Sequence, residues 1–453
     1  MNFPVPTRSD IKCYCRSRLG VRNRGEREGC QQSFEFDIDA DIGFEFGIYL
    51  ERGAKTGWTP DPEAFYFFGM LMPNGVERLF NDGGSVTHPI QGKGTYKVYC
   101  LLAQSIGLIG LETQGLVDIR FSTKCPLSCT RLNVSNSKLT KLDVTSLRLL
   151  EWLQCGSVRF DYPMNPPVSA SYLKELNTSN VTQLKHLFIA GASLAKLNIS
   201  TNRNLQEFSL NNTGLDILDF SFNNFLRVLH VRDASLYSIV GLQGHNYLCS
   251  LIVYESSLSS LNLSGCGDLE VVHVDENSPY LETLNISDCP RFYELEVAYS
   301  PVKIINLANC IALKVLNLGP FSWITQLPNL EVLNLEGCVS LELLNARNSK
   351  LQELDLSDCI KLVSVAVDGN ALTKFILKSE VLINVSASHN NLSSSGVDKV
   401  LVHLSNMPID TSWTVPPRKR CVLTQNNPPT QVGVNAAAAL VASGYWEVWY
   451  DLE

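Results

Sequence analysis

The sequence predicts a mainly β protein, a solenoid with two short strands in each coil. A small all-β domain precedes the solenoid, and a cap of helices and strands closes it. Three observations predict this fold. A phrase with apolar residues at its first, fourth and sixth positions recurs from Leu194 to Leu382. Alternate copies of the phrase end in a cysteine. The segments before about residue 125 and after about residue 392 lack the phrase.

The phrase itself predicts a strand. In the copy that runs from Leu258 to Cys266, "LSSLNLSGC", apolar residues alternate with polar ones, as in a short strand with one buried face. Most copies follow each other after ten to twelve residues, which leaves room for a tight turn and none for a helix. The cysteine-bearing copies lie 21 to 28 residues apart, so one coil holds two strands.

This pattern resembles the leucine-rich-repeat family, and most closely its short bacterial 21-residue class. The resemblance covers roughly residues 131 to 426. It implies that the last position of the phrase turns inward and carries Asn or Cys. A structural ladder of buried thiols is therefore expected at Cys266, Cys289, Cys310, Cys338 and Cys359, with Asn202, Asn223, Asn277, Asn370 and Asn390 in equivalent places. Zinc needs convergent tetrahedral ligands, so a linear stack does not predict a metal site.

Four domains are expected along the chain. Residues 1–32 form a basic arm of net charge +4, and residues 33–125, with alternating stretches such as "FEFDIDADIGFEFGIYL", form the all-β domain. Residues 126–392 form the solenoid, interrupted by a proline-rich loop at 155–173. Residues 393–453 form the cap in the order helix, strand, helix, strand.

The cap has readable signals. A helix is expected from about Ser395, with Val397, Val400, Leu401 and Leu404 on its apolar face. A second helix is capped by Thr430 and stopped by Gly444. The closing segment, "NNPPT", an alanine-rich helix and "GYWEVWYD", resembles the ends of repeat-bearing structural proteins of bacteriophages. That resemblance implies a virion protein, although Tyr445 departs from the usual pattern.

Catalytic and metal-binding signals are weak. No nucleophile motif, zinc-protease motif or phosphate loop is present, so we expect no enzyme and no cofactor. Asp37, Asp39 and Asp41 have the spacing that begins a calcium loop, but Ile48 stands where Glu is needed, which favours a solvated strand face. Whether metal binds at Cys13, Cys15, Cys30, Cys125 or Cys129 stays open, because none has the paired spacing of a zinc site.

Composition narrows the setting. The net charge of −8 argues against a nucleic-acid partner. The start has no apolar signal segment, and no run of eighteen apolar residues predicts a membrane span. Without a secretion signal, the fourteen cysteines are expected as reduced thiols.

Function is then expected on the outward faces of the strands. One face carries a uniform column of Asn and Asp, which favours a structural role. The other varies, and its candidate recognition residues are His230, Arg232, His273, Asp275, Glu294, Glu296 and Arg347. An insertion, "GPFSWITQLPN", offers Phe321 and Trp323 as a protruding contact, or as side chains folded over the core.

Three function classes follow. The favoured one is a non-enzymatic bacteriophage virion protein, a spike, fibre or capsid-associated chain. It would dock by its N-terminal part and recognise other virion proteins or a host-surface receptor through the solenoid, as a possible homo-oligomer. The alternative is a bacterial leucine-rich-repeat protein, in the cytoplasm or at the cell surface, that binds a host or cellular protein. An enzyme with its catalytic unit in residues 33–125 is the third class.

Overall fold

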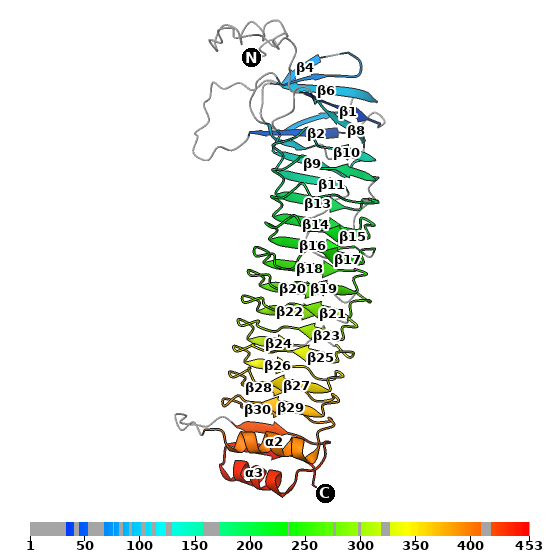
Figure 1. Ribbon diagram of the computed structural model, residues 1–453. Helices are drawn as coiled ribbons and strands as arrows, with labels where there is room; N and C mark the ends of the chain where they lie inside the picture. The colour runs from blue at the N-terminus through cyan, green and yellow to red at the C-terminus, as the bar shows by residue number, and fades with distance from the viewer. Residues whose placement is uncertain are drawn as a thin grey trace, which may run out of the picture. The chain divides into compact units, whose positions relative to one another are not determined.

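The computed structural model describes fifteen segments of the chain: 33–39, 45–52, 68–75, 77–80, 85–89, 93–100, 106–110, 115–123, 129–156, 172–233, 235–274, 278–297, 300–318, 327–408 and 418–452. They belong to two compact units, Met1–Leu205 and Gln206–Glu453. Strands dominate both units (Figure 1). The basic arm lies outside the described residues. The boundaries between the four expected domains stay predictions.

The first unit begins with an antiparallel sheet of order β4-β3-β6-β1-β8. Its strands are β1 (Ser33–Ile38), β3 (Phe68–Leu71), β4 (Glu77–Phe80), β6 (Gly94–Cys100) and β8 (Leu116–Phe121). Phe34, Phe36 and Ile38 are buried in alternation with the polar residues of β1. The Phe36 ring stacks on Tyr96 at 5.2 Å between centroids. Strict alternation in the sequence therefore yields a strand with one buried face.

A second sheet of this unit joins the predicted all-β domain to the first repeats. Its order is β5-β2-β7-β9-β11-β13, and β7 pairs in parallel with β9, the first repeat strand. The bounds are β2 (Glu45–Arg52), β5 (Ser85–Pro89), β7 (Ile106–Gly110), β9 (Arg131–Ser135), β11 (Trp152–Gly156) and β13 (His186–Ala190). Because β7 occupies the hydrogen-bonding edge of β9, the N-terminal strands cap the first coil. A small parallel sheet holds β10 (Lys141–Asp143) and β12 (Glu175–Asn177).

The second unit stacks coils whose strands form two columns, both visible in Figure 1. One column contains β14 (Glu207–Asn211), β16 (Val228–Arg232), β18 (Ser250–Tyr254), β20 (Val271–Val274), β22 (Glu294–Val297), β24 (Val315–Asn317), β26 (Leu343–Asn345), β28 (Ser364–Ala366) and β30 (Asn384–Ser386). The other contains β15 (Ile217–Asp219), β17 (Ser238–Val240), β19 (Ser260–Asn262), β21 (Thr283–Asn285), β23 (Ile304–Asn306), β25 (Val332–Asn334), β27 (Glu353–Leu356) and β29 (Lys374–Leu377).

Pairing between coils is parallel in both columns, and each described coil of residues 206–297 links its strands without a helix. The apolar positions of the phrase fill the interior. Leu258, Leu261 and Leu263 of one half-coil are buried, as are Leu269 and Val272 of the next. Burial of a leucine contributes about 1.5–3 kcal/mol to folding, so the regular anchors supply the core. The predicted two-strand solenoid is confirmed.

The predicted cap is also confirmed. Helix α2 (Ser394–Ser405) is N-capped by Ser393, whose side chain accepts a hydrogen bond from the Gly396 amide, and it buries the four predicted apolar residues. Strand β31 (Lys419–Val422) follows, then helix α3 (Gln431–Ala442) with Thr430 as N-cap, then β32 (Trp446–Trp449). Gly444 has φ +76°, the left-handed conformation that ends a helix.

Candidate interaction surface

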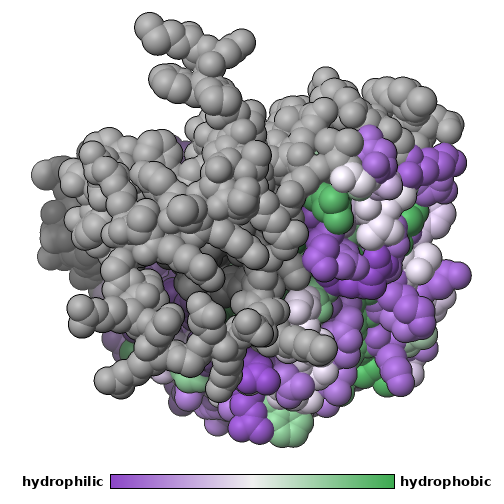
Figure 2. All heavy atoms as spheres, turned by 90° about the horizontal axis from the view of Figure 1, so that it is seen from above, coloured by the Kyte–Doolittle hydropathy of each residue, from purple (hydrophilic) through white to green (hydrophobic). Residues whose placement is uncertain are grey.

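Two outward faces of the second unit differ in character. The recognition face consists of the outward side chains of β14, β16, β18, β20 and β22, and the asparagine face of those of β15, β19, β21, β23, β25 and β27. In a view from above, which does not look onto either face, the coloured residues are mostly hydrophilic with scattered apolar ones (Figure 2).

The centre of the recognition face is a row of residues in register across four adjacent strands. His230 pairs with Ile252, Ile252 with His273, and His273 with Glu296. Strand spacing of about 4.8 Å makes this row about 14 Å long. Ile252 is 9% exposed, so it forms an apolar floor between the two histidines. The sequence placed both histidines on the outward face, and pairing brings them into one line.

The two histidines have different surroundings. His273 Nε2 lies 3.2 Å from Glu294 Oε1 and 3.8 Å from Glu296 Oε2, both on the neighbouring strand. Burial lowers the pKa of His230 below its ordinary value, and the charge of Glu207 opposes this only in part. His230 is therefore a neutral imidazole at neutral pH, able to donate one hydrogen bond and accept another.

An ion pair borders the row. Arg232 donates from Nε to Glu255 Oε2 at 2.9 Å and from Nη2 to Oε1 at 2.7 Å, a bidentate arrangement that fixes both side chains. This contact lowers the pKa of Glu255. Glu255 has φ +45°, a left-handed conformation that costs a glutamate about 1–3 kcal/mol. The sequence did not single out Glu255, because only the fold brings it beside Arg232.

The described outward charges of the recognition face sum to an acidic surface. Arg232 is neutralised by Glu255, whereas Glu294 and Glu296 add exposed negative charge beside His273. Fixed negative charge on a parallel sheet favours a cationic partner through electrostatic complementarity.

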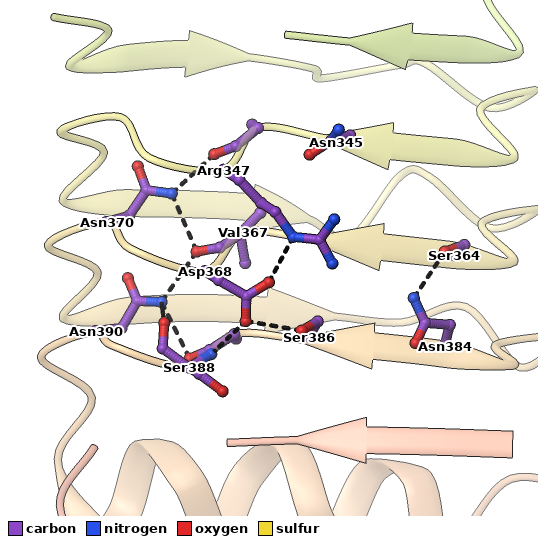
Figure 3. A network of polar contacts seen from close by, with 12 residues as sticks. Asn345, Arg347, Ser364, Val367, Asp368, Asn370, Asn384, Ser386, Ser388 and Asn390 are labelled. Carbon is purple, nitrogen blue, oxygen red and sulfur yellow. Dashed lines mark hydrogen bonds and ion pairs between the residues drawn. The ribbon is translucent and has the colours of Figure 1, made fainter. Parts of the chain in front are cut away.

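Arg347, the remaining described recognition candidate, lies elsewhere. It follows β26, in a six-stranded sheet separate from that of β16 to β22. Its Nε donates to Asp368 Oδ2 at 2.7 Å, and Ser386 Oγ and the Ser388 amide donate to Asp368 Oδ1 (Figure 3). Arg347 thus ties three successive coils together. Asp275, Phe321 and Trp323 lie outside the described residues.

The asparagine face uses its column of side chains within the fold. Each Asn or Asp accepts a hydrogen bond from the backbone amide two residues later. Asp219, Asn262, Asn285, Asn306, Asn334 and Asp355 share this contact, at 2.9–3.2 Å. This turn diverts the backbone from the ladder after three strand residues. Because the column satisfies turns, it has little left to offer a partner.

The five ladder cysteines are fully buried. Each thiol donates to a backbone carbonyl of the preceding coil: Leu242, Leu263, Ile286, Leu307 and Leu335, at Sγ–O distances of 3.2, 3.3, 3.2, 3.1 and 3.9 Å. Burial raises the pKa of Cys266 and Cys338 to about 11, that of Cys289 and Cys359 to about 12, and that of Cys310 further. These thiols satisfy backbone groups and are poor nucleophiles.

The ladder includes a residue that sequence analysis missed. His245 occupies the inward position between Asn223 and Cys266, because the Leu248 amide bonds to the His245 carbonyl as the Leu269 amide bonds to that of Cys266. The phrase there has one extra residue before Leu242, which shifts its register. The spacing of His245 to Leu248, equal to that of Cys266 to Leu269, was the available signal.

At the opposite corner, asparagines form a second ladder near the C-terminal end (Figure 3). Asn390 Nδ2 donates to the carbonyls of Val367 and Ala387, both at 3.0 Å, while its Oδ1 accepts from the Leu372 amide. Asn370 and Asn426 repeat this pattern one coil before and one coil after. Asn277 lies outside the described residues.

Among the described segments, no three His, Cys, Asp or Glu side chains are grouped to hold a metal ion. Asp37 accepts from Arg120 at 2.9 Å, and Asp39 pairs with Lys93 at 2.7 Å. Cys129 Sγ donates to the Arg131 carbonyl at 3.0 Å. Asp41, Cys13, Cys15, Cys30 and Cys125 are not among the described residues.

The described residues also show the state of the thiols and whether a helix could span a membrane. Nine described cysteines, including the ladder, are free thiols. No helix in the described part of the chain is both long and apolar enough to cross a membrane.

Known proteins resemble this chain only at low similarity. No family model and no curated protein matches the sequence. Solved structures that match include internalin InlF of Listeria monocytogenes (17% identity, 69% of this chain and 87% of that chain, TM-score 0.35). The functional domain of InlJ from the same species, which includes a cysteine ladder, matches with 17% identity, 70% and 74% coverage and a TM-score of 0.31. The APL1 leucine-rich repeat domain matches with 16% identity, 63% and 86% coverage and a TM-score of 0.31.

Proposed function

We propose that this leucine-rich-repeat β-solenoid is a non-enzymatic recognition protein whose recognition face binds a protein partner. The observation that supports the proposal most is the contrast between its two outward faces. The asparagine face uses its polar atoms in turns. The recognition face aligns His230, His273 and Glu296 over an apolar floor, on strands held rigidly by parallel pairing.

The partner is expected to present a basic segment. Glu294 and Glu296 are half exposed beside His273, and the adjacent Arg232 is already paired with Glu255. A cationic segment would therefore gain charge complementarity without breaking the Arg232–Glu255 ion pair. Such attraction raises the association rate and is screened by salt.

Charge reversal tests the face. The double variant Glu294→Lys/Glu296→Lys is compared with Glu336→Lys, which reverses an exposed charge on the asparagine face. Each full-length protein is used to capture partners from an extract of its source cells, and captured proteins are quantified by mass spectrometry. We expect partners of the wild type to fall by roughly tenfold or more with the double variant and to persist with Glu336→Lys. Equal loss with both variants would refute the face assignment.

The favoured biological setting is a bacteriophage virion, as a spike, fibre or capsid-associated protein. The basic arm and the resemblance of the "GYWEVWYD" segment to bacteriophage structural proteins support this choice. Cysteine spacings of 21 and 23 residues also support assignment to the short bacterial repeat class. Mass spectrometry of purified particles tests the setting, because a virion protein must be found in them.

The alternative setting is a bacterial repeat protein, in the cytoplasm or at the cell surface, that binds a host or cellular protein. The recognition face would serve it equally well. Size-exclusion chromatography with captured partners separates the settings: a single tight soluble complex favours the bacterial protein. Self-association in the same experiment would reveal the possible homo-oligomer.

A further inference from the structure

We propose that His245, which occupies the inward corner position (here called a rung of the ladder) that Cys266 occupies in the next coil, is sensitive to acid. Its protonation opens the coil from Leu236 to Glu255. This coil carries the middle of the recognition face, so acid would release a partner. The release rests on the proposed function, whereas the opening of the coil does not.

The rung has unusual contacts. His245 is 3% exposed and stands where the next coil has Cys266. The Cys266 thiol donates to the Leu242 carbonyl, whereas neither ring nitrogen of His245 reaches a partner with ordinary hydrogen-bond geometry, although the backbone groups of Gly241 and Phe220 lie beside the ring. Each of the five ladder cysteines donates to a backbone carbonyl, so His245 is a weak point in an otherwise satisfied ladder.

The groups around His245 offset a positive charge only in part. The preceding coil contributes the Phe220 backbone and Asn223, and its own coil contributes the Gly241 backbone. The next coil contributes Cys266, a neutral thiol whose pKa burial raises to about 11. The carboxylates of the adjoining turns are already engaged, Asp219 by the Ser221 amide at 2.9 Å and Asp268 by Arg291 at 3.0 Å. An imidazolium at this rung would be buried without a counter-charge, which is strongly unfavourable.

The direction of the pH effect follows. Burial lowers the pKa of His245, and the backbone groups of Gly241 and Phe220 oppose this only in part. The opened coil binds a proton with the ordinary histidine pKa of about 6.5. The rung therefore stabilises the closed coil fully above about pH 6.5, and this contribution is lost as the pH falls towards the lowered value. Within that window the open fraction rises by up to about tenfold per pH unit.

Opening would disturb the recognition face directly. Strand β18 belongs to this coil and places Ile252 between His230 and His273. Glu255, at the end of the coil, holds Arg232. Loss of the closed coil therefore removes both the apolar floor and the bordering ion pair, and local openings of this kind need not unfold the whole unit.

Hydrogen exchange tests the opening without any partner. The full-length wild type is compared with His245→Asn and His245→Cys, which install residues that the chain uses at the neighbouring rungs. Exchange of peptides spanning residues 236–256 is measured at about pH 7.5 and about pH 5.5, corrected for intrinsic rates. We expect protection in the wild type to fall severalfold at the lower pH and to stay nearly constant in both variants. Equal acid sensitivity in wild type and in a folded variant would overturn the proposal.

Titration of the imidazole gives a second, independent result. The chain has seven histidines, so selective labelling yields a small set of NMR signals, and the His245→Asn variant identifies one. A His245 signal that titrates below the ordinary range supports the proposal, and titration at or above it contradicts the proposal. His230→Asn separates the contribution of the other desolvated histidine. If the coil opens in acid while partner capture is unchanged, the acid sensitivity of His245 is supported, but the proposed binding of a partner by the recognition face is refuted.

Discussion

The inner corner of the coils shows how one position can be filled by different chemistry. Asn223, His245 and Cys266 occupy successive rungs, and all three are buried. A thiol fits because it is small and donates one weak hydrogen bond to a carbonyl of the preceding coil. Histidine fits the space but leaves both ring nitrogens without a partner of ordinary hydrogen-bond geometry. The position therefore selects for size first and for hydrogen bonding second.

Burial should make the ladder thiols unreactive. For a thiol of pKa about 11, such as Cys266, only about one molecule in a thousand is a thiolate at pH 8. We expect alkylation of the native protein to modify Cys249, which is partly exposed, well before Cys266, Cys289, Cys338 or Cys359. Peptide mapping after native labelling and after labelling in urea measures this. Early modification of the four ladder thiols in native protein would contradict their burial.

At the scale of the element, the asparagine face explains why its strands are short. The side chain of Asn285 accepts from the Ser287 amide and donates to Asn262 Oδ1, each at 3.2 Å. The turn that this contact stabilises ends the strand. A polar outward column thus encodes strand length rather than a binding site.

Substitution of Asn285 tests this role. Asn285→Ala removes both contacts, and we expect a loss of about 0.5–1.5 kcal/mol in the free energy of unfolding. Asn285→Asp keeps the acceptor, as Asp219 and Asp355 do, and should lose less. Urea unfolding of the full chain provides the measurement, with Ser260→Ala as an outward control expected within about 0.5 kcal/mol. Equal losses for Ala and Asp would argue against the turn contact.

The two cap helices carry a matched pair of glycines. A Cβ at Gly433 would overlap Asp398 Oδ1 and Pro429, whereas one at Gly396 would meet its nearest neighbour at an ordinary 3.5 Å. Asp398 accepts from the Thr430 amide and hydroxyl, so the overlap would break the junction between α2 and α3. We expect Gly433→Ala to destabilise the protein by about 1–3 kcal/mol. Gly396→Ala should be neutral or stabilise it by up to about 1 kcal/mol. Thermal unfolding distinguishes these outcomes, and destabilisation by both would count against the argument.

At the scale of the whole molecule, each coil of a unit contacts chiefly its neighbours, as expected for a solenoid. Stability is then a sum of local terms, and a defect should spread only a short distance. The acid-sensitive rung depends on this property, because a coil can open while distant coils of the same unit stay closed.

A core substitution tests how far a defect spreads. Leu261→Ala removes a buried side chain of β19 and should cost about 2–5 kcal/mol. We expect hydrogen exchange to accelerate in β19 and β21 and to change much less in β28 and β30. Leu261→Met, which conserves volume, should cost less than about 1.5 kcal/mol and serves as the control. Uniform acceleration across residues 206–452 would show that this unit opens as one cooperative body.

The sequence by itself determined the coil. The spacing of Leu258, Leu261 and Leu263 is a local property of the sequence. A period-two pattern interrupted by tight turns predicts a coil with two strands. The inward cysteines and the outward position of His230 and His273 follow from the same local periodicity, and the helix cap at Thr430 follows from a local sequence signal.

Only the tertiary structure decided which residues of neighbouring coils lie next to each other. The register between coils set His230, Ile252, His273 and Glu296 in one row, and placed Glu255 against Arg232. It also moved Arg347 to another sheet and put His245 on the ladder. These outcomes depend on hydrogen bonds between residues about twenty positions apart. A repeat of ten to twelve residues does not specify such pairings, because each strand could dock on its neighbour in more than one register.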